Sequence, residues 1–118
     1  MNEILHIYKN IPKLINICEE VGNLQLKFHK TKIEYTSKEN NTPVTDIDIK
    51  SSNIITKKIK DFSNEIPIIS EENYQGINID SCFWIIDPLD GTRNYINEGN
   101  QFCINIAFVK NNYPIFGM

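Results

Sequence analysis

The segment from residue 82 to residue 92 restricts the fold of this 118-residue chain more than any other part of it. It opens with the longest apolar run in the sequence, at 82–86, and passes directly into Asp87-Pro88-Leu89-Asp90-Gly91-Thr92. A short apolar run bounded by turn-forming residues is typical of a strand buried in a sheet. The run is far shorter than the roughly 18 residues that cross a bilayer, so we expect no integral membrane insertion.

Two helices are predicted before this strand. Pro12 interrupts the first apolar repeat, so we expect the main helix to begin near residue 10 or 11 and to run to about residue 29, with a short or kinked helix before it. The second is predicted from residue 45 to about residue 62, because Thr45 and Asp48 fit a capping box. The apolar residues that share one face of the first helix are Ile4, Ile7, Ile11, Leu14, Ile15, Cys18 and Val21.

Extended segments make up most of the remaining chain. We expect strands at 32–36, 67–70, 83–86, 102–109 and 113–118, polar turns or loops at 37–43 and 73–81, and a short helix at 92–97. Because no later helix covers the outer face of these strands, the pattern predicts the front half of a larger α/β domain.

Charge and cysteine content exclude several classes of protein. Twelve basic and fifteen acidic residues give a net charge of −3, so we expect no nucleic-acid polymer as a partner. Cys18, Cys82 and Cys103 are far apart, and no histidine stands near them at a zinc-ligand spacing. We therefore expect reduced, buried thiols and a cytoplasmic location.

The residues after the apolar run have the chemistry of a metal site. The predicted strand delivers Asp87 to its carboxyl end, and Asp90 follows three residues later, so both carboxylates point into one small volume. Neighbouring like charges need a cation, and hard oxygen ligands suit Mg²⁺, with the Leu89 carbonyl as a further donor. We expect Gly91 to permit close backbone approach or a positive φ. We expect Thr92 to cap the next helix, whose free N–H groups favour a phosphate.

Each of these features also has a plain structural interpretation. The turn can be a surface turn rich in Asp, Pro and Gly, and an EF-hand fits poorly because Leu89 and Gly91 occupy positions that need oxygen side chains. Asp48 can simply stabilise the start of a helix, and Lys38 can be a surface lysine. Glu71 and Glu72 can form a solvated loop edge, although a buried strand delivers them as well.

The same residues resemble a known family. Asp87-Pro88-Leu89-Asp90-Gly91-Thr92 resembles the metal-binding motif of the inositol monophosphatase-like, lithium-sensitive, Mg-dependent phosphatase superfamily. Pro43-Val44-Thr45-Asp46-Ile47-Asp48 is similar to its Pro-Val-Thr-x-x-Asp segment, and Ser70-Glu71-Glu72 to its paired glutamates. The resemblance runs from about Ile15 to Met118 and implies two N-terminal helices on a mostly antiparallel sheet, the first portion of a sugar-phosphatase-like αβαβα fold.

One branch of the superfamily is the most similar, the bacterial 3'(2'),5'-bisphosphate nucleotidases. The segments at 37–45, 67–72 and 101–107 resemble that branch. This implies hydrolysis of 3'-phosphoadenosine 5'-phosphate to AMP and phosphate. Arg93-Asn94-Tyr95 departs from the Lys-Glu-Phe of that branch, and Asn94 is typical of inositol monophosphatases, so inositol monophosphate is the alternative substrate.

Roles in metal binding follow from the resemblance. It implies that Glu71 and Asp87 bind a first Mg²⁺ together with the Leu89 carbonyl, and that Asp87 and Asp90 share a second. A complete site of this kind holds two or three Mg²⁺ ions.

Roles in catalysis and substrate binding follow in the same way. The resemblance implies that Asp48 and Thr92 orient and activate the attacking water, and that the backbone N–H groups of Gly91 and Thr92 hold the phosphate. Lys38 would lie near the metal site and contact the substrate.

The resemblance covers only the first part of a phosphatase domain. The family continues for about the same length again, and its later Trp-Asp motif, which supplies a further carboxylate, has no counterpart in this sequence. We therefore expect residues 1–118 to be the N-terminal part of a single phosphatase domain, and to have weak or no activity alone. A non-catalytic, metal-binding remnant is the alternative. The expected substrate is a small-molecule phosphate ester, and a homodimer is the assembly to test.

Overall fold

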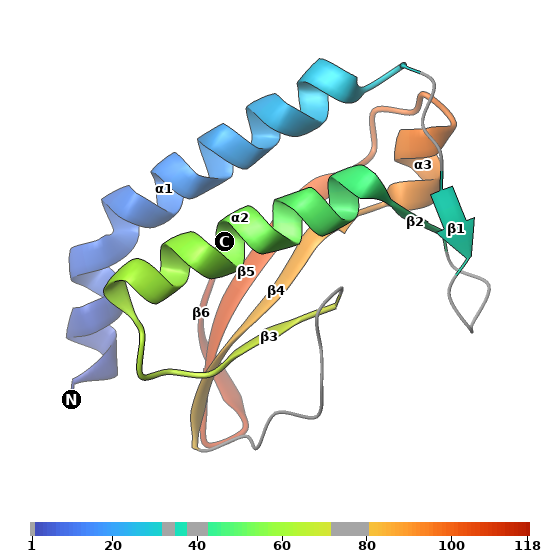
Figure 1. The fold of residues 1–118 in the computed structure, drawn as a ribbon. Helices are drawn as coiled ribbons and strands as arrows, with labels where there is room; N and C mark the ends of the chain where they lie inside the picture. Colours follow the sequence, from blue (N-terminus) through green and yellow to red (C-terminus); the bar gives the residue numbers. More distant parts are fainter. Residues whose placement is uncertain (1, 32–34, 38–42, 72–80) are drawn as a thin grey trace.

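The computed structural model describes residues 2–31, 35–37, 43–71 and 81–118 (Figure 1). Two long helices lie side by side over one face of a four-stranded sheet, and a two-stranded sheet and a short helix lie at one end of the helix pair (Figure 1). The helices are α1 (Glu3–Phe28), α2 (Asp46–Phe62) and α3 (Thr92–Ile96). The strands are β1 (Tyr35–Ser37), β2 (Pro43–Thr45), β3 (Ile68–Ser70), β4 (Cys82–Asp90), β5 (Cys103–Lys110) and β6 (Tyr113–Gly117).

The larger sheet has the order β3-β4-β5-β6. β3 runs parallel to β4, and the other neighbours are antiparallel, which confirms the predicted arrangement of helices on a mostly antiparallel sheet. The hairpin between β5 and β6 turns at Asn111 and Asn112, whose φ angles are 49° and 68°. Asparagine tolerates this left-handed region better than most residues, which accounts for the tight turn between the predicted strands.

The prediction that Pro12 delays the main helix is wrong. α1 runs without a break from Glu3 to Phe28, with Asn2 as its N-cap. Proline removes one hydrogen bond, to the carbonyl four residues earlier, which here belongs to Tyr8. Pro12 and Tyr8 both lie on the exposed side of α1, so water can satisfy that carbonyl.

The start of α2 was predicted correctly. Thr45 is the N-cap, its hydroxyl accepts from the Asp48 N–H at 3.2 Å, and the Asp48 carboxylate accepts from the Thr45 N–H at 2.9 Å. This is a capping box with Asp in the place of the usual Glu. Strands are also confirmed at 68–70, 103–110 and 113–117, and a short helix at 92–96.

Two strand assignments differ from the prediction. β4 continues beyond residue 86 to Asp90 through a bulge, where an abrupt end was expected. β2 forms an antiparallel pair with β1, in which Ser37 lies opposite Pro43. The sequence had assigned residue 43 to a polar turn. Residues 32–34, 38–42 and 72–80, including part of the predicted first strand and the predicted polar loop, lie outside the described residues.

The main core lies between the helix pair and the sheet. Trp84 is fully buried, forms an edge-to-face contact with Phe108 at 4.9 Å between ring centroids, and donates its indole N–H to Ser63 Oγ at 2.9 Å. A buried indole N–H needs such an acceptor. The other buried apolar residues of this core are Ile7, Leu14, Ile17, Val21, Ile55, Ile59, Ile66, Ile68, Ile86 and Ile106.

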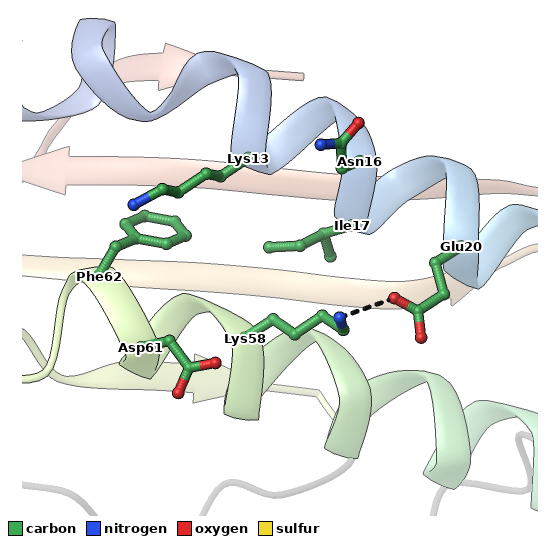
Figure 2. A pocket seen from close by; sticks show the side chains of 7 residues that line it. All are labelled: Lys13, Asn16, Ile17, Glu20, Lys58, Asp61 and Phe62. Atoms are coloured by element: carbon green, nitrogen blue, oxygen red, sulfur yellow. Dashed lines mark ion pairs between the residues drawn. The ribbon is translucent and has the colours of Figure 1, made fainter.

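The outer side of the helix pair carries a groove of about 320 Å³ between α1 and α2 (Figure 2). Lys58 of α2 forms an ion pair with Glu20 of α1 at 2.9 Å, and the Lys13 ammonium lies 5.5 Å from the centre of the Phe62 ring (Figure 2). Both contacts join the two helices. Exposed pairs of this kind contribute at most about 1 kcal/mol each, so the buried core holds the helices together.

The helices and the cysteines of the described residues bear on two further predictions. No helix among the described residues is long and apolar enough to span a bilayer. The three cysteines are free thiols. Cys18 and Cys82 are half-buried, whereas Cys103 is exposed, so the expectation of buried thiols is wrong for Cys103. Its sulfur lies 3.9 Å from Asp90 Oδ2, where the bulge interrupts regular pairing.

Replacing Pro12 with alanine should stabilise the protein. Alanine restores the N–H that proline lacks, a gain of roughly 3 kcal/mol in a helix interior, less about 1 kcal/mol for the freer unfolded chain. We expect the free energy of unfolding in urea to rise by about 2 kcal/mol. Gly22→Ala is the matched control in the same helix, because an added Cβ there meets nothing within 4 Å, and it should add about 1 kcal/mol. A neutral or destabilising Pro12→Ala would show that the helix breaks at Pro12.

Candidate active site

The predicted metal turn lies on a bulge of β4. Asp87 pairs with Asn105 of β5, and the next registered pair joins Asp90 to Cys103. Three steps along β4 therefore match two along β5, so one residue is extra. Pro88 lies inside this interval and lacks the N–H that a regular ladder needs. The bulge brings Asp87, Leu89 and Asp90 out of simple alternation at the end of the strand.

Asp87 is held in a half-buried position with acidic neighbours. Burial, followed by a hydrogen bond with the Glu71 side chain and the negative charges of Glu71 and Asp90, raises the pKa of Asp87 to about 7, partly offset by the Leu89 N–H. Within the described part of the chain, Asp87 Oδ1 is buried and has no hydrogen-bond partner. A buried carboxylate oxygen without a donor is rare and needs an explanation, such as an ion.

A divalent cation fits these donors. Glu71, Asp87 and Asp90 interact electrostatically, and a cation would relieve their mutual repulsion and satisfy the unpartnered oxygen. Among residues 2–31, 35–37, 43–71 and 81–118, however, no three His, Cys, Asp or Glu side chains converge closely enough to hold a metal as they stand. The structure thus brings the predicted carboxylates to one end of the sheet, but it does not hold them at the distances of a formed metal site.

The surface in front of these carboxylates is hollow. A depression of about 460 Å³ lies on the sheet between β3, β4 and β5, beside Glu71 and Asp87. Its floor is apolar, and the carboxylates of Glu71 and Asp87 lie at its edge. The residues that line it are Ile69, Ser70, Glu71, Ile85, Ile86, Asp87, Asn105 and Ala107.

Asp48 and Thr92 meet although they are far apart in the sequence. Thr92 Oγ1 lies 2.8 Å from Asp48 Oδ1 and 3.1 Å from the Leu89 carbonyl oxygen. Asp48 is fully buried, and its second oxygen accepts from the N–H and the hydroxyl of Thr45. The prediction that Thr92 caps α3 is wrong, because its hydroxyl makes these contacts and the N-cap residue is Gly91.

Gly91 is required by the geometry of the turn. Its φ is 90°, and a Cβ at this position would lie 2.4 Å from the carbonyl oxygen of Gln101. Only glycine combines this left-handed backbone with such close approach. The loop before β5 therefore packs directly on the turn. This confirms the close backbone approach that the sequence predicted at Gly91.

Two of the predicted site residues cannot be placed. Lys38 and Glu72 lie outside the described residues. Glu71 is exposed and directly follows β3, and its N–H donates to the Ile86 carbonyl at 3.2 Å, which fixes it beside the strand that carries Asp87.

Sequence reasoning did not find Gln25. This glutamine is buried in α1 and donates to the Pro88 carbonyl at 2.7 Å. A signal was present, because Gln25 falls one helical turn after Val21 on the apolar face of α1. A polar residue on such a face usually has a specific buried partner.

Comparison with known proteins assigns the chain to a family. The model of the inositol monophosphatase family matches residues 9–118. The chain belongs to the inositol monophosphatase family. The solved structure of Thermotoga maritima IMPase is 27% identical, with a TM-score of 0.83 over 92% of this chain and 42% of that one. The helix pair and sheet described above are thus the family fold.

Two similar curated relatives share one name. The 3'(2'),5'-bisphosphate nucleotidase CysQ of Buchnera aphidicola is 33% identical over 117 residues, which are 93% of this chain and 43% of that protein. The enzyme of the same name from Aggregatibacter actinomycetemcomitans is 35% identical over 109 residues, 89% of this chain and 40% of that protein. The chain thus spans about two fifths of the length of these family members.

Substituting Gly91 should destabilise the fold at the site. Gly91→Ala introduces a left-handed non-glycine residue and a clash with the backbone of Gln101, so we expect a loss of roughly 3 kcal/mol in the free energy of unfolding. Gly117→Ala is the control, since an added Cβ there meets nothing within 4 Å and the change should stay within about 0.5 kcal/mol. Equal losses in urea unfolding would contradict this geometry.

The metal-free protein should lose stability as the pH rises toward 7. The folded pKa of Asp87 is about 7, above the value near 3.9 of an unfolded aspartate. Between these values the folded state binds more protons, so Asp87 makes the free energy of unfolding fall from about pH 4 to about pH 7 and stay level above it. Unfolding in EDTA at about pH 5 and pH 7.5 should show a larger loss for the unaltered protein than for Asp87→Asn. Identical losses would exclude a raised pKa.

Proposed function

We propose that the protein is a Mg²⁺-dependent phosphomonoesterase, and specifically a 3'(2'),5'-bisphosphate nucleotidase that converts 3'-phosphoadenosine 5'-phosphate to AMP and phosphate. The observation that carries the proposal is the unpartnered, buried Asp87 Oδ1 among acidic neighbours, at the same turn as the Asp48–Thr92 contact. The choice of substrate is taken from the name of the curated relatives. The chain aligns with only 43% of one relative and 40% of the other, so its own residues do not define the whole substrate pocket.

Mg²⁺ would be held by Glu71, Asp87, the Leu89 carbonyl and Asp90, with two or three ions in a complete site. When bound, Mg²⁺ lowers the pKa of a coordinated water and stabilises charge on the phosphoryl and leaving oxygens. The raised pKa of Asp87 supports the assignment, because acidic neighbours that disfavour one another's ionisation favour a divalent cation.

Asp48 and Thr92 would act on the attacking water. With its proton directed to Asp48 Oδ1, the Thr92 hydroxyl keeps a lone pair that can accept a hydrogen bond from water and orient it. The Thr45 capping box holds Asp48 in place through its other oxygen. We also propose that the backbone N–H groups of Gly91 and Thr92 bind the phosphate, and that Lys38 contacts the substrate.

Inositol monophosphate is the second candidate substrate. It is favoured by Asn94, which departs from the nucleotidase pattern, and by the similarity to the IMPase of Thermotoga maritima. A cytoplasmic location, a homodimer and the assignment of residues 1–118 to one part of a single phosphatase domain stay predictions.

The test compares the two substrates with the protein at the length that its source cells produce. We expect phosphate release from 3'-phosphoadenosine 5'-phosphate to exceed release from inositol monophosphate, and to stop in EDTA. Asp87→Asn removes a charged metal ligand, so we expect roughly a 100-fold or greater loss of kcat/KM.

Asp46→Asn is the matched control, because Asp46 is an exposed carboxylate in the first turn of α2, outside the proposed metal ligands, and should leave kcat/KM within about twofold. Equal effects of the two substitutions would show that the turn containing Asp87 does not bind the catalytic metal. Greater release from inositol monophosphate would reverse the order of the substrates, and release from neither would favour the non-catalytic remnant.

A further inference from the structure

Gln25 is a buried polar residue that the proposed chemistry does not use. It is 2% exposed, at the C-terminal end of the face that α1 presents to the rest of the molecule. The amide Nε2 donates to the Pro88 carbonyl at 2.7 Å and to Ser51 Oγ at 3.1 Å. One side chain of α1 therefore contacts both α2 and the turn of β4.

The Pro88 carbonyl depends on this donor because of the bulge. Pro88 falls between the registered pairs of Asp87 and Asp90, so regular ladder bonding is interrupted there. The residue is buried, and a buried carbonyl without a donor is destabilising. The Gln25 amide replaces the missing ladder partner from the helix side of the sheet. It thereby fixes the direction of the Pro88–Leu89 peptide, which lies between Asp87 and the Leu89 carbonyl.

The backbone of Gln25 is bonded on the other side of the same turn. The hydroxyl of Tyr95, a fully buried residue of α3, donates to the Gln25 carbonyl at 2.7 Å. The backbone N–H of His29 donates to that carbonyl too, at 2.9 Å. Gln25 thus contacts the turn itself through Pro88 and the helix that follows the turn through Tyr95.

We propose that Gln25 is a positioning residue for the metal-binding turn. It holds the bulge in the shape that places Asp87, Leu89 and Asp90 together at the end of β4. Gln25 touches neither metal nor substrate and acts through the Pro88 peptide. The inference rests on the proposed function for the identity of the ion, and on hydrogen bonds among described residues for its geometry.

The test measures Mg²⁺ binding directly, by calorimetric titration of the metal-free protein at the length that its source cells produce. Gln25→Met keeps the length of the side chain and removes both donors. We expect Mg²⁺ to bind roughly 10-fold more weakly, as is usual when a group that orients metal ligands is lost. Phosphate release at limiting Mg²⁺ should fall and recover when Mg²⁺ is raised, while the KM for the nucleotide stays the same.

Asn10→Met is the matched control for lost stability. Asn10 is also a buried amide of α1, with 8% exposure, and it donates to the His6 carbonyl at 2.8 Å. It lies 15 residues from Gln25, roughly 22 Å along the helix, so its loss should leave the Mg²⁺ affinity unchanged. If both variants lose thermal stability but bind Mg²⁺ within twofold of the unaltered protein, Gln25 is only structural and the proposal is overturned.

A second variant keeps the test decisive if Gln25→Met does not fold. Gln25→Asn retains an amide in the core but is one methylene too short to reach Pro88, and the same twofold criterion applies to it. The outcome is separable from that of the proposed function. An unaltered protein that binds Mg²⁺ but hydrolyses neither phosphate ester would overturn the function alone, and one that binds no Mg²⁺ would overturn both.

Discussion

The buried carboxylate of Asp48 joins the start of α2 to the turn that follows β4, and most of the site depends on this contact. One oxygen completes the capping box with Thr45, and the other accepts from Thr92, 44 residues later in the chain. The carboxylate is fully buried, so each of these donors replaces a water molecule that it lost on folding. Because α2 packs on the core through its later turns, the position of Thr92 is set by the core.

Asp87 has the opposite environment. Where the oxygens of Asp48 accept from Thr45 and Thr92, Asp87 faces two acidic side chains, and in the described part of the chain its Oδ1 has no donor. The two carboxylates lie on neighbouring elements, yet their surroundings separate their roles. One is satisfied within the protein and serves to orient a neighbour, whereas the other keeps an unpartnered oxygen beside acidic side chains, as the proposed Mg²⁺ site requires. This is the division expected of a metal-assisted hydrolase, in which a polar scaffold holds ligands that are unstable without the ion.

The sequence was a good guide to local features and a poor one to contacts between distant residues. The capping box of Thr45 was predictable because both partners lie within one turn of helix. The predicted helix break at Pro12 was wrong, because the cost of a proline depends on whether the freed carbonyl faces water, and that depends on packing. The cap assigned to Thr92 was wrong because Gly91 is the N-cap of α3, and the Thr92 hydroxyl donates to Asp48 of another helix. Gln25 was missed because its partner, a backbone carbonyl in a bulge, has no signature in the residue type.

α2 shows how one helix can serve both the core and the site. Its later turns bury Ile55 and Ile59 in the main core, whereas its first turns bury Asp48, Ser51 and Ser52 against the ends of the strands. Ser52 Oγ lies 2.6 Å from the hydroxyl of Ser70, the residue before Glu71, and Ser51 accepts from the α1 amide that reaches the turn of β4. Apolar side chains at these positions would give similar stability, because a satisfied buried polar pair adds little net free energy. They would not fix the direction of a strand end, however, since apolar contacts are non-directional whereas hydrogen bonds require alignment. The polar half of α2 therefore contributes orientation more than stability, and it does so beside the two strands that deliver Glu71 and Asp87.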